Sequence, residues 1–397
     1  MLTPAEAEAA IAASLAPLPV EACALEQATG RVLREAIDSD LDQPPFDRVA
    51  MDGIAITISE FAAGRRSFRI AGMAAAGAPP PALVEPGTCI EVMTGAVLPA
   101  GADAVIPVEE LEVRDGHAEL SASARVATFS NVHRKGTDTR AGARVLAPGV
   151  RLRGPELAIA ASAGRASLLV SRQPRIGIVS TGDELVPPGV RPSAGQVRRS
   201  NAYAIAATLR EHGYQALSDA HSGDDPAALR ALLAAELASR DVLVLSGGVS
   251  AGRFDHVPAT LTALGVRQVF HKVAQRPGKP LWFGTHPDGQ VVFALPGNPV
   301  STLVCLVRYV LPALVRLSGG RPAPPLLASL LHAIEAHSAL TAFIPVERPE
   351  DDRERRLRPR LTHGSGDFTA LAGTVGFVEL APGQSWEPGS LAPLYNW

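Results

Sequence analysis

Glycine, hydroxyl and acidic residues gather in three short clusters, each directly after an apolar segment. The first cluster is Thr181-Gly182-Asp183-Glu184, the second is Ser246-Gly247-Gly248-Val249-Ser250, and the third is Pro296-Gly297-Asn298-Pro299-Val300-Ser301. Glycines let a ligand approach the backbone closely, and the free N–H groups at a helix start favour an anion. In the third cluster Asn298 suits the N-cap of a helix and Pro299 its first turn. The clusters therefore predict a binding site for an anionic ligand.

Acidic residues accompany these clusters. A carboxylate beside a bound anion repels it by about 4 kcal/mol per close unit pair at an effective dielectric of about 20. A Mg²⁺ ion that bridges carboxylate and phosphate oxygens reverses that sign. The acidic residues are therefore interpreted as metal ligands or water-positioning groups, although a helix cap is an equally good alternative for the Asp-Asp-Pro sequence at 224–226. They are Asp183, Glu184, Asp224, Asp225 and Asp255.

Two cations lie on a short stiff segment, Gln275-Arg276-Pro277-Gly278-Lys279-Pro280. A fixed Arg and Lys suit a phosphate or another oxyanion. The alternative is a solvated β-turn. Arg276 and Lys279 are therefore candidate substrate ligands.

The three clusters must be positioned by segments 175–317, where apolar strand-like runs alternate with helical patterns. This alternation predicts a mostly parallel sheet covered on both faces, with ligands bound beyond the carboxyl ends of its strands. An ordinary β–α turn is the alternative for any single cluster, but it explains three on one edge poorly. The expected strands are 175–181, 216–221, 241–246, 266–273, 281–284 and 291–295, and the expected helices are 201–212, 226–237, 257–264 and one from Pro299.

The remaining segments predict two further kinds of module. Short β runs broken by Gly and Pro between residues 42 and 150 suggest a β-rich module, with strands at 67–71, 89–93 and 104–107. A proline-rich linker at 322–325 precedes a tail, 326–397, that resembles a small β domain. A helix over 4–15 has Thr3 as its N-cap and Glu6 as the acid of a capping box.

Composition limits the partners and the compartment. A chain of 397 residues predicts about two to four domains. The net charge of −3 provides no basic field to recruit nucleic acid. Cys23, Cys89 and Cys305 share no metal-ligand or redox spacing, which predicts a reducing, cytoplasmic compartment. The N-terminus lacks the basic start of a signal peptide, and the apolar run 300–317 carries Arg308 and Arg316, so it predicts a buried helix rather than a membrane span.

Eight motifs, met in order along nearly the whole chain, resemble the MoeA/gephyrin family of molybdopterin molybdenumtransferases. They are PPFDRVAMDGIA (44–55), VMTGAVLPAGADAVIPVEE (92–110), GTDTRAGARVLAPG (136–149), IVSTGDEL (178–185), GQVRRSN (195–201), LSGGVSAGRFD (245–255), RPGKPLWFG (276–284) and FALPGNPVSTLVCLVRYVLPAL (293–314).

The resemblance implies an α/β multidomain fold whose central domain is similar to the MogA-type molybdopterin adenylyltransferases. It also implies a homodimer, with the active site between one subunit's α/β domain and the partner's inserted domain. The implied domains are an α/β domain (1–15 and 173–320), an inserted β-rich domain (47–138), a discontinuous linking domain (16–46 and 139–172) and a C-terminal β-barrel (321–397).

Matching the motifs residue by residue implies the site. The implied metal is Mg²⁺, held by Asp52, Glu184 and Asp255. The implied catalytic residues are Asp52, Thr94, Asp138, Glu184 and Asp255. The implied substrate-binding residues are Asp183, Asp225, Ser246, Gly247, Gly248, Ser250, Arg276, Lys279, Pro296, Gly297, Asn298, Pro299 and Ser301.

The implied reaction inserts molybdate into adenylylated molybdopterin and releases AMP. Further implied partners are a molybdopterin adenylyltransferase and apo-molybdoenzymes, with neither nucleic acid nor membrane among them. One alternative is a paralogue that acts on another oxyanion or as an adenylyltransferase, although the inserted and C-terminal domains would be superfluous to the latter. Another is a non-catalytic scaffold that binds the pterin.

Four positions depart from the usual family pattern. Val49 stands where Ser is usual, Arg253 where an acidic residue is common, Pro258 where Lys is common, and Arg276 where Lys is frequent. The first three remove polar groups or invert a charge near the expected site.

Overall fold

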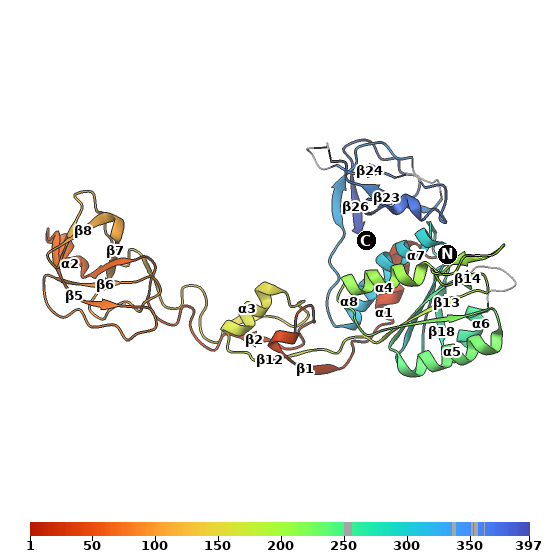
Figure 1. Ribbon diagram of the computed structural model, residues 1–397, viewed down its shortest axis with the longest axis horizontal. Coiled ribbons are helices and arrows are strands. Elements are labelled where there is room, and N and C mark those ends of the chain that lie inside the picture. The colour runs from red at the N-terminus through yellow and green to blue at the C-terminus, as the bar shows by residue number, and fades with distance from the viewer. Residues whose placement is uncertain (250–255, 336–338, 351, 353–355, 361) are drawn as a thin grey trace. The chain divides into compact units, whose positions relative to one another are not determined.

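The computed structural model describes the chain except residues 250–255, 336–338, 351, 353–355 and 361 (Figure 1). Its contacts divide the chain into two compact units. The first unit comprises Met1–Arg34, Pro148–Arg153 and Leu168–Trp397, and the second comprises Glu35–Ala147 and Gly154–Ser167.

A six-stranded sheet forms the centre of the first unit, in the order β16-β13-β17-β21-β20-β18. The first four strands are parallel to their neighbours, whereas β20 pairs antiparallel with β21 and with β18. The prediction of a mostly parallel sheet is therefore confirmed. Its strands are β13 (Ile176–Thr181), β16 (Leu217–Ser222), β17 (Val242–Ser246), β18 (Arg267–His271), β20 (Trp282–Thr285) and β21 (Val291–Leu295).

Helices cover both faces of this sheet (Figure 1). Ile178 and Val244 pack on one face in a core that includes α1, α4, α7 and α8, while Val179 and Leu245 pack on the other face with α5 and α6. Successive residues of one strand face opposite sides, so a strand buried on both faces must be apolar throughout. The helices are α1 (Pro4–Ala13), α4 (Asn201–Glu211), α5 (Pro226–Ser239), α6 (Val257–Ala263), α7 (Pro299–Cys305) and α8 (Leu311–Leu317).

Helix α1 begins at the residue that its sequence predicts. At α1 the Thr3 hydroxyl accepts the Glu6 N–H at 3.3 Å, and the Glu6 carboxylate accepts the Thr3 N–H at 2.8 Å, which completes the predicted capping box.

Helices α7 and α8 are joined by a π-helical turn, η3 (Leu306–Val310). The resulting helix, Pro299–Leu317, is apolar enough to span a membrane, with a mean hydropathy of 1.7, but 78% of it is buried inside the protein. It is therefore a core helix.

A small barrel ends the first unit. The strand order is β24-β23-β25-β26-β22, and a parallel bridge between Leu330 and Leu357 joins the ends of β22 and β24, which closes the sheet. A short strand of the α/β region, β19 (Gln275–Arg276), adds to β23. The barrel strands are β22 (Leu326–Ser329), β23 (Thr341–Glu347), β24 (Arg358–Pro359), β25 (Thr374–Leu380) and β26 (Leu391–Asn396), with the 3-10 turn η4 (Thr369–Leu371).

The second unit contains a six-stranded sheet of order β7-β4-β6-β5-β9-β8. The expected β-rich module is therefore present, and Ile54, Phe68 and Ile106 are in its core. Its sheet consists of β4 (Gly53–Ile56), β5 (Ser67–Ala74), β6 (Thr88–Val92), β7 (Ala104–Pro107), β8 (Leu111–Arg114) and β9 (His117–Leu120). Smaller elements of this unit are β2 (Ile37–Asp38), β3 (Arg48–Val49), β10 (Val132–His133), β11 (Arg144–Leu146), α2 (Ile58–Ala62), η2 (Val108–Glu110) and α3 (Gly154–Ser162).

Three minor pieces complete the described elements. Strand β1 (Val20–Ala24) pairs with β12 (Ser167–Ser171), and the 3-10 turn η1 (Leu25–Gln27) follows β1. Strands β14 (Leu185–Val186) and β15 (Val197–Arg198) pair in parallel just beyond the first cluster.

The four domain boundaries that the family resemblance implies stay a prediction.

One carboxylate fixes the start of the central strands. Asp241 precedes β17 and accepts hydrogen bonds from Arg172 at 2.8 and 2.9 Å, from the Arg175 side chain at 3.0 Å and from the Arg175 N–H at 2.7 Å. Burial favours the neutral acid, but the hydrogen bonds from Arg172 and Arg175 hold the pKa of Asp241 well below its ordinary value. The hydrogen bonds between Arg175 and Asp241 thus hold the first residues of β13 and β17 together.

We expect Asp241→Asn to lower the free energy of unfolding by about 1–3 kcal/mol at pH 7, because a half-buried ion pair loses its charge. The lowered pKa stabilises the fold above the ordinary carboxyl pKa of about 3.9, and this stabilisation is lost as the pH falls below that value. Urea midpoints of the two proteins should therefore stay apart from pH 7 to about pH 4, and should converge as the pH falls from about 4 towards about 2. The exposed Glu387→Gln is the control; a constant gap across this range would contradict the assignment.

Candidate functional site

The three clusters meet around one cavity of about 420 Å³. Strands β13, β17 and β21 are adjacent and parallel, with Ser180 opposite Ser246 and Ser246 opposite Leu295, so the loops that follow them begin side by side. Thr181 lies opposite Ser222 of β16, which brings Asp224 to the same edge. The cavity is lined by Thr181, Gly182, Glu184, Asp224, Gly247, Gly248, Val249, Pro280, Pro296, Gly297 and Asn298.

Glycine is required where the second cluster passes the first. Gly247 has φ +103°, and a Cβ there would lie 2.7 Å from the Thr181 carbonyl oxygen. Gly248 has φ +68°, and its Cβ would lie 2.7 Å from Val257 Cγ2. Both positions combine a left-handed backbone with a close approach, which only glycine tolerates.

We predict that Gly247→Ala lowers the free energy of unfolding by about 1–3 kcal/mol more than Gly289→Ala does, because a strand carbonyl of β13 cannot move away. Gly289 is the matched control: its φ is +96°, but nothing lies within 4 Å of its Cβ position. Both variants therefore carry the strain of a positive φ, and only Gly247→Ala adds a clash. Equal losses of unfolding free energy in the two variants, measured by urea unfolding, would contradict the close approach of Gly247 to the Thr181 carbonyl.

The acidic residues at this edge have different roles. Glu184 and Asp224 line the cavity. Asp183 instead accepts the Asp224 N–H at 3.1 Å, and Asp225 accepts the Ala228 N–H at 2.8 Å as the N-cap of α5. For Asp225 the structure thus favours the helix-cap alternative. Of the expected residues, Ser250 and Asp255 lie outside the part of the chain that the structure describes, as does Arg253.

Oxygen donors at the cavity suit a hard cation. Glu184 and Asp224 are joined there by Thr181, whose hydroxyl oxygen is buried with no hydrogen-bond partner among the described residues. Mg²⁺ commonly binds one or two carboxylates and completes its shell with waters and substrate phosphates. Within the described ranges no three His, Cys, Asp or Glu side chains gather as a metal site. The donors thus fit a Mg²⁺ ion that the substrate helps to hold, rather than a cage made by the protein alone.

Asn201 joins two of the clusters. Its side-chain N–H groups donate to the Ser246 hydroxyl at 2.8 Å and to the Gly297 carbonyl at 2.7 Å. The sequence argument missed this bridging role, although Asn201 ends the GQVRRSN motif. Ser246 is therefore buried as an acceptor behind the cavity rather than on its wall.

The start of α7 differs from the expected anion site. Asn298 lies at the N-cap, but its side chain donates to the Ser365 hydroxyl at 2.7 Å instead of capping the helix. The Val300 N–H donates to the Ser365 carbonyl at 3.1 Å. The expectation that this first turn offers its N–H groups to an anion is therefore wrong for Val300, because the barrel domain already occupies it. Pro299 and Ser301 do not line the cavity, and Ser301 is buried.

Hydrogen bonds from buried side chains anchor the cationic segment, residues 275–280. The Tyr309 hydroxyl donates to Gln275 Oε1, and Gln275 Nε2 donates to the Pro277 carbonyl at 3.1 Å. Burial raises the pKa of Tyr309, which keeps its hydroxyl protonated as the donor. Arg276 and Lys279 are exposed on this anchored segment, while Pro280 reaches the cavity wall.

In the second unit, two of the expected catalytic residues contact each other. One oxygen of Asp52 accepts the Thr94 hydroxyl at 2.7 Å and the Thr94 N–H at 2.6 Å. These hydrogen bonds lower the pKa of Asp52. The hydrogen bond from the Thr94 hydroxyl makes the larger contribution, and that from the Thr94 N–H makes the smaller one. The neighbouring Met51 is 40% exposed.

Asp138 belongs to a chain of three exposed groups. Its carboxylate accepts a hydrogen bond from His133 Nε2 at 2.8 Å, and Arg48 donates to His133 Nδ1 at 3.0 Å. Because arginine only donates and a carboxylate only accepts, the His133 ring is fixed as the Nε2–H tautomer. The sequence argument missed His133 and Arg48; they are brought together because β3 and β10 pair in register.

We predict that Thr94→Val raises the pKa of Asp52 towards the ordinary aspartate value, because the larger of the two hydrogen-bond contributions is removed. A carboxyl-carbon NMR titration of the full chain would measure the shift. Thr94→Ser keeps the hydroxyl and serves as the control. A Thr94→Val titration that coincides with the Thr94→Ser titration would rule out the hydroxyl as the cause.

Two of the unusual residues have structural explanations. Val49 is completely buried among the apolar side chains of the second unit, including Ala55 and Val92, so no polar group is lost from a surface there. Pro258 lies in the first turn of α6, where a missing N–H costs no hydrogen bond.

Comparisons with known proteins agree with this geometry. Residues 2–164 match the model of the MoeA N-terminal region (domains I and II), and residues 177–316 match that of a probable molybdopterin binding domain. A relative named molybdopterin molybdenumtransferase from Synechocystis sp. is 41% identical over 372 residues, which is 93% of both chains. One of the same name from Bacillus subtilis is 32% identical over 353 residues, covering 87% of this chain and 79% of the relative.

Solved structures give the same result. A crystal structure of the molybdopterin biosynthesis MoeA protein from Pyrococcus horikoshii is 29% identical, with a TM-score of 0.78 over 100% of this chain and 99% of that one. A second structure from this organism, at 24% identity, has a TM-score of 0.84 over the full length of both chains and supports the fold. The chain belongs to the MoeA family, whose curated members are named molybdopterin molybdenumtransferases.

Proposed function

We propose that this protein inserts molybdate into adenylylated molybdopterin and releases AMP, as one step of molybdenum-cofactor biosynthesis. The convergence of three clusters on one cavity supports the proposal most strongly, because it joins close backbone approach and acidic residues at one sheet edge, with Pro280 of the cationic segment on the cavity wall. The family membership supports the same role.

Substrate phosphates would be held by backbone and by cations. Gly247 and Gly248 lie where only a glycine backbone fits, so their peptide groups can approach a phosphate closely. Arg276 and Lys279 would neutralise its charge from the anchored segment. Substrate-binding roles for Asp183, Asp225, Ser246, Ser250, Pro299 and Ser301 stay predictions of the family resemblance.

Glu184 and Asp224 would hold Mg²⁺, with Asp255 and, from another subunit, Asp52 as further predicted ligands. When bound, the ion would neutralise the charge of the substrate phosphates and the charge that develops during transfer. The protein's own contribution is positioning and electrostatics rather than a covalent nucleophile. This agrees with the three thiols, which are all buried, and with burial raising the pKa of Cys89 to about 12.

We expect Asp224→Ala to lower molybdate insertion by at least about 10²-fold and to raise the Mg²⁺ concentration needed for half-maximal rate, and Glu184→Gln to do the same. The adjacent Asp225→Ala should instead cost about 0.5–2 kcal/mol of stability through its lost cap, with insertion retained. Protein-bound molybdenum by mass spectrometry and released AMP by chromatography would measure both.

The outcomes separate the possible functions. If Asp224→Ala and Asp225→Ala lose molybdate insertion to the same extent, the assignment of Asp224 as a metal ligand and of Asp225 as a helix cap is wrong. If the wild-type protein retains pterin-adenylate intact with Mg²⁺ and molybdate present, it is a binding scaffold and the proposed transfer is wrong.

We further propose a homodimer in which Asp52 and Asp138 of one subunit complete the cavity of the other. Co-expression of Asp52→Ala and Glu184→Gln subunits with different tags tests this. Each homodimer should be inactive, whereas the purified mixed dimer should regain about half of wild-type activity, because one of its two sites is intact. No recovery in the mixed dimer would place both carboxylates in one subunit's site.

Location and partners complete the proposal. Free, buried cysteines suit a reducing, cytoplasmic compartment. A molybdopterin adenylyltransferase would supply the substrate, and apo-molybdoenzymes would accept the product.

A further inference from the structure

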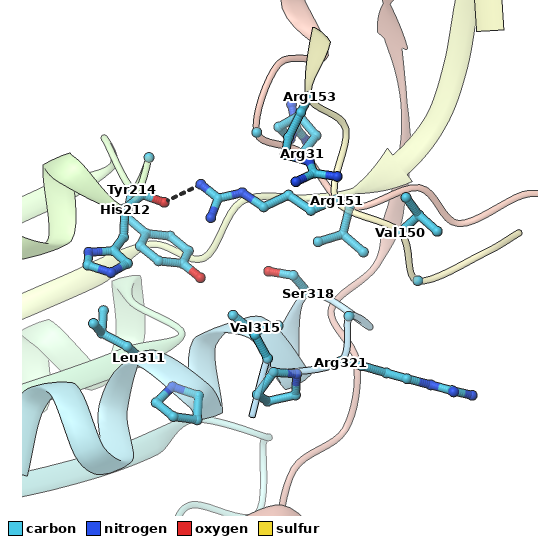
Figure 2. Close-up of a pocket in the computed structure, with 18 of the residues that line it drawn as sticks. Arg31, Val150, Arg151, Arg153, His212, Tyr214, Leu311, Val315, Ser318 and Arg321 are labelled. Carbon is cyan, nitrogen blue, oxygen red and sulfur yellow. Dashed lines mark hydrogen bonds between the residues drawn. The ribbon is translucent and has the colours of Figure 1, made fainter. Parts of the chain in front are cut away.

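A second cavity, of about 600 Å³, lies in the first unit and shares no lining residue with the first. It lies between α8, the connection from α4 to β16, and the proline-rich linker that leads to the barrel (Figure 2). A cavity of this volume is in the usual range for a small-molecule site. Nothing in the proposed reaction uses it.

The floor of this second cavity is apolar and stiff. Leu311 and Val315 of α8 point into it, and Leu394 of β26 and Pro324 of the linker complete the floor. Proline fixes φ, so the linker holds its shape without a ligand. An apolar body can therefore bind here without first ordering the walls.

Four arginines line this cavity, and no Asp or Glu is among the described residues that line it. Arg31, Arg151 and Arg153 lie together at one side, whereas the side chain of Arg321 points away (Figure 2). This concentration of cations contrasts with a chain whose net charge is −3. An anion is the ligand charge that such a wall favours.

One of these arginines keeps an unpaired charge for a ligand. Arg151 donates to the His212 carbonyl at 2.9 Å, and within the described residues it has no carboxylate partner, so its charge is not neutralised. Arg31 donates to the Ser171 carbonyl at 2.7 Å and pairs with Glu21, but its Nε is buried with no partner among the described residues.

Tyr214 adds a neutral donor to the same space. Its hydroxyl points into the cavity towards Ser318 (Figure 2). Burial raises the pKa of Tyr214 to about 12, so the hydroxyl stays protonated at neutral pH. It would donate to an anionic group and would not repel it.

We propose that this cavity binds a small organic anion: an apolar, preferably aromatic body on the floor of Leu311 and Val315, with one carboxylate, sulfonate or phosphate group at Arg151 and the Tyr214 hydroxyl. The proposal does not rest on the proposed function, because the two cavities have separate walls.

A pair of fluorescent probes tests the charge and the apolar body separately on the full chain. 8-Anilinonaphthalene-1-sulfonate carries an anionic group, and N-phenyl-1-naphthylamine has the same apolar body without it. We expect one molecule of the sulfonate to bind per chain, at least about fivefold more tightly than the neutral amine, as one charge-assisted contact allows. Equal affinities for the two probes would overturn the proposal.

Three variants locate the probe. Arg151→Gln should weaken the sulfonate by at least about fivefold and leave the amine unchanged, and Val315→Trp should weaken both by filling the floor. Arg230→Gln removes an exposed arginine of α5 and should change neither. If Arg151→Gln binds the sulfonate like the wild-type protein, the proposal is wrong; because Arg151 is exposed, this outcome does not depend on whether Val315→Trp folds.

Discussion

The parallel hydrogen-bonded register of β13, β17 and β21 is the constraint on which the site depends. It places Ser180, Ser246 and Leu295 side by side, so the glycine-rich turns that follow must share one edge. The Asp241 ion pairs fix the opposite ends of β13 and β17. A slip of one residue in any of these strands would exchange its faces in the core and separate the loops at the cavity.

The barrel domain takes part in the site through backbone and side-chain contacts. Ser365 accepts the Val300 N–H and the Asn298 side chain, and β19 pairs with β23 beside the cationic segment. Helix α7 and the segment around Arg276 are therefore held from both the sheet and the barrel. Preorganised groups of this kind stabilise charge without first having to reorient.

The two cavities of the first unit differ in the sign of their fixed charge. Glu184 and Asp224 line the first, which suits an anionic substrate only with a cation between them. Arg31, Arg151 and Arg153 line the second, without carboxylates among its described residues. Because the chain as a whole is slightly acidic, each site must make its own field from nearby groups.

The local elements and the converging loops could be predicted from the amino-acid sequence. The apolar runs of β13, β17 and β21, the capping box of α1 and the three clusters were all readable because strand burial, capping and turns depend on neighbours in the chain. The folded chain was needed to show that Ser365 occupies the start of α7, that Asn201 bridges two clusters, and that arginines gather around a second cavity. These depend on contacts between residues far apart in the chain, for which neither spacing nor residue type carries a signal.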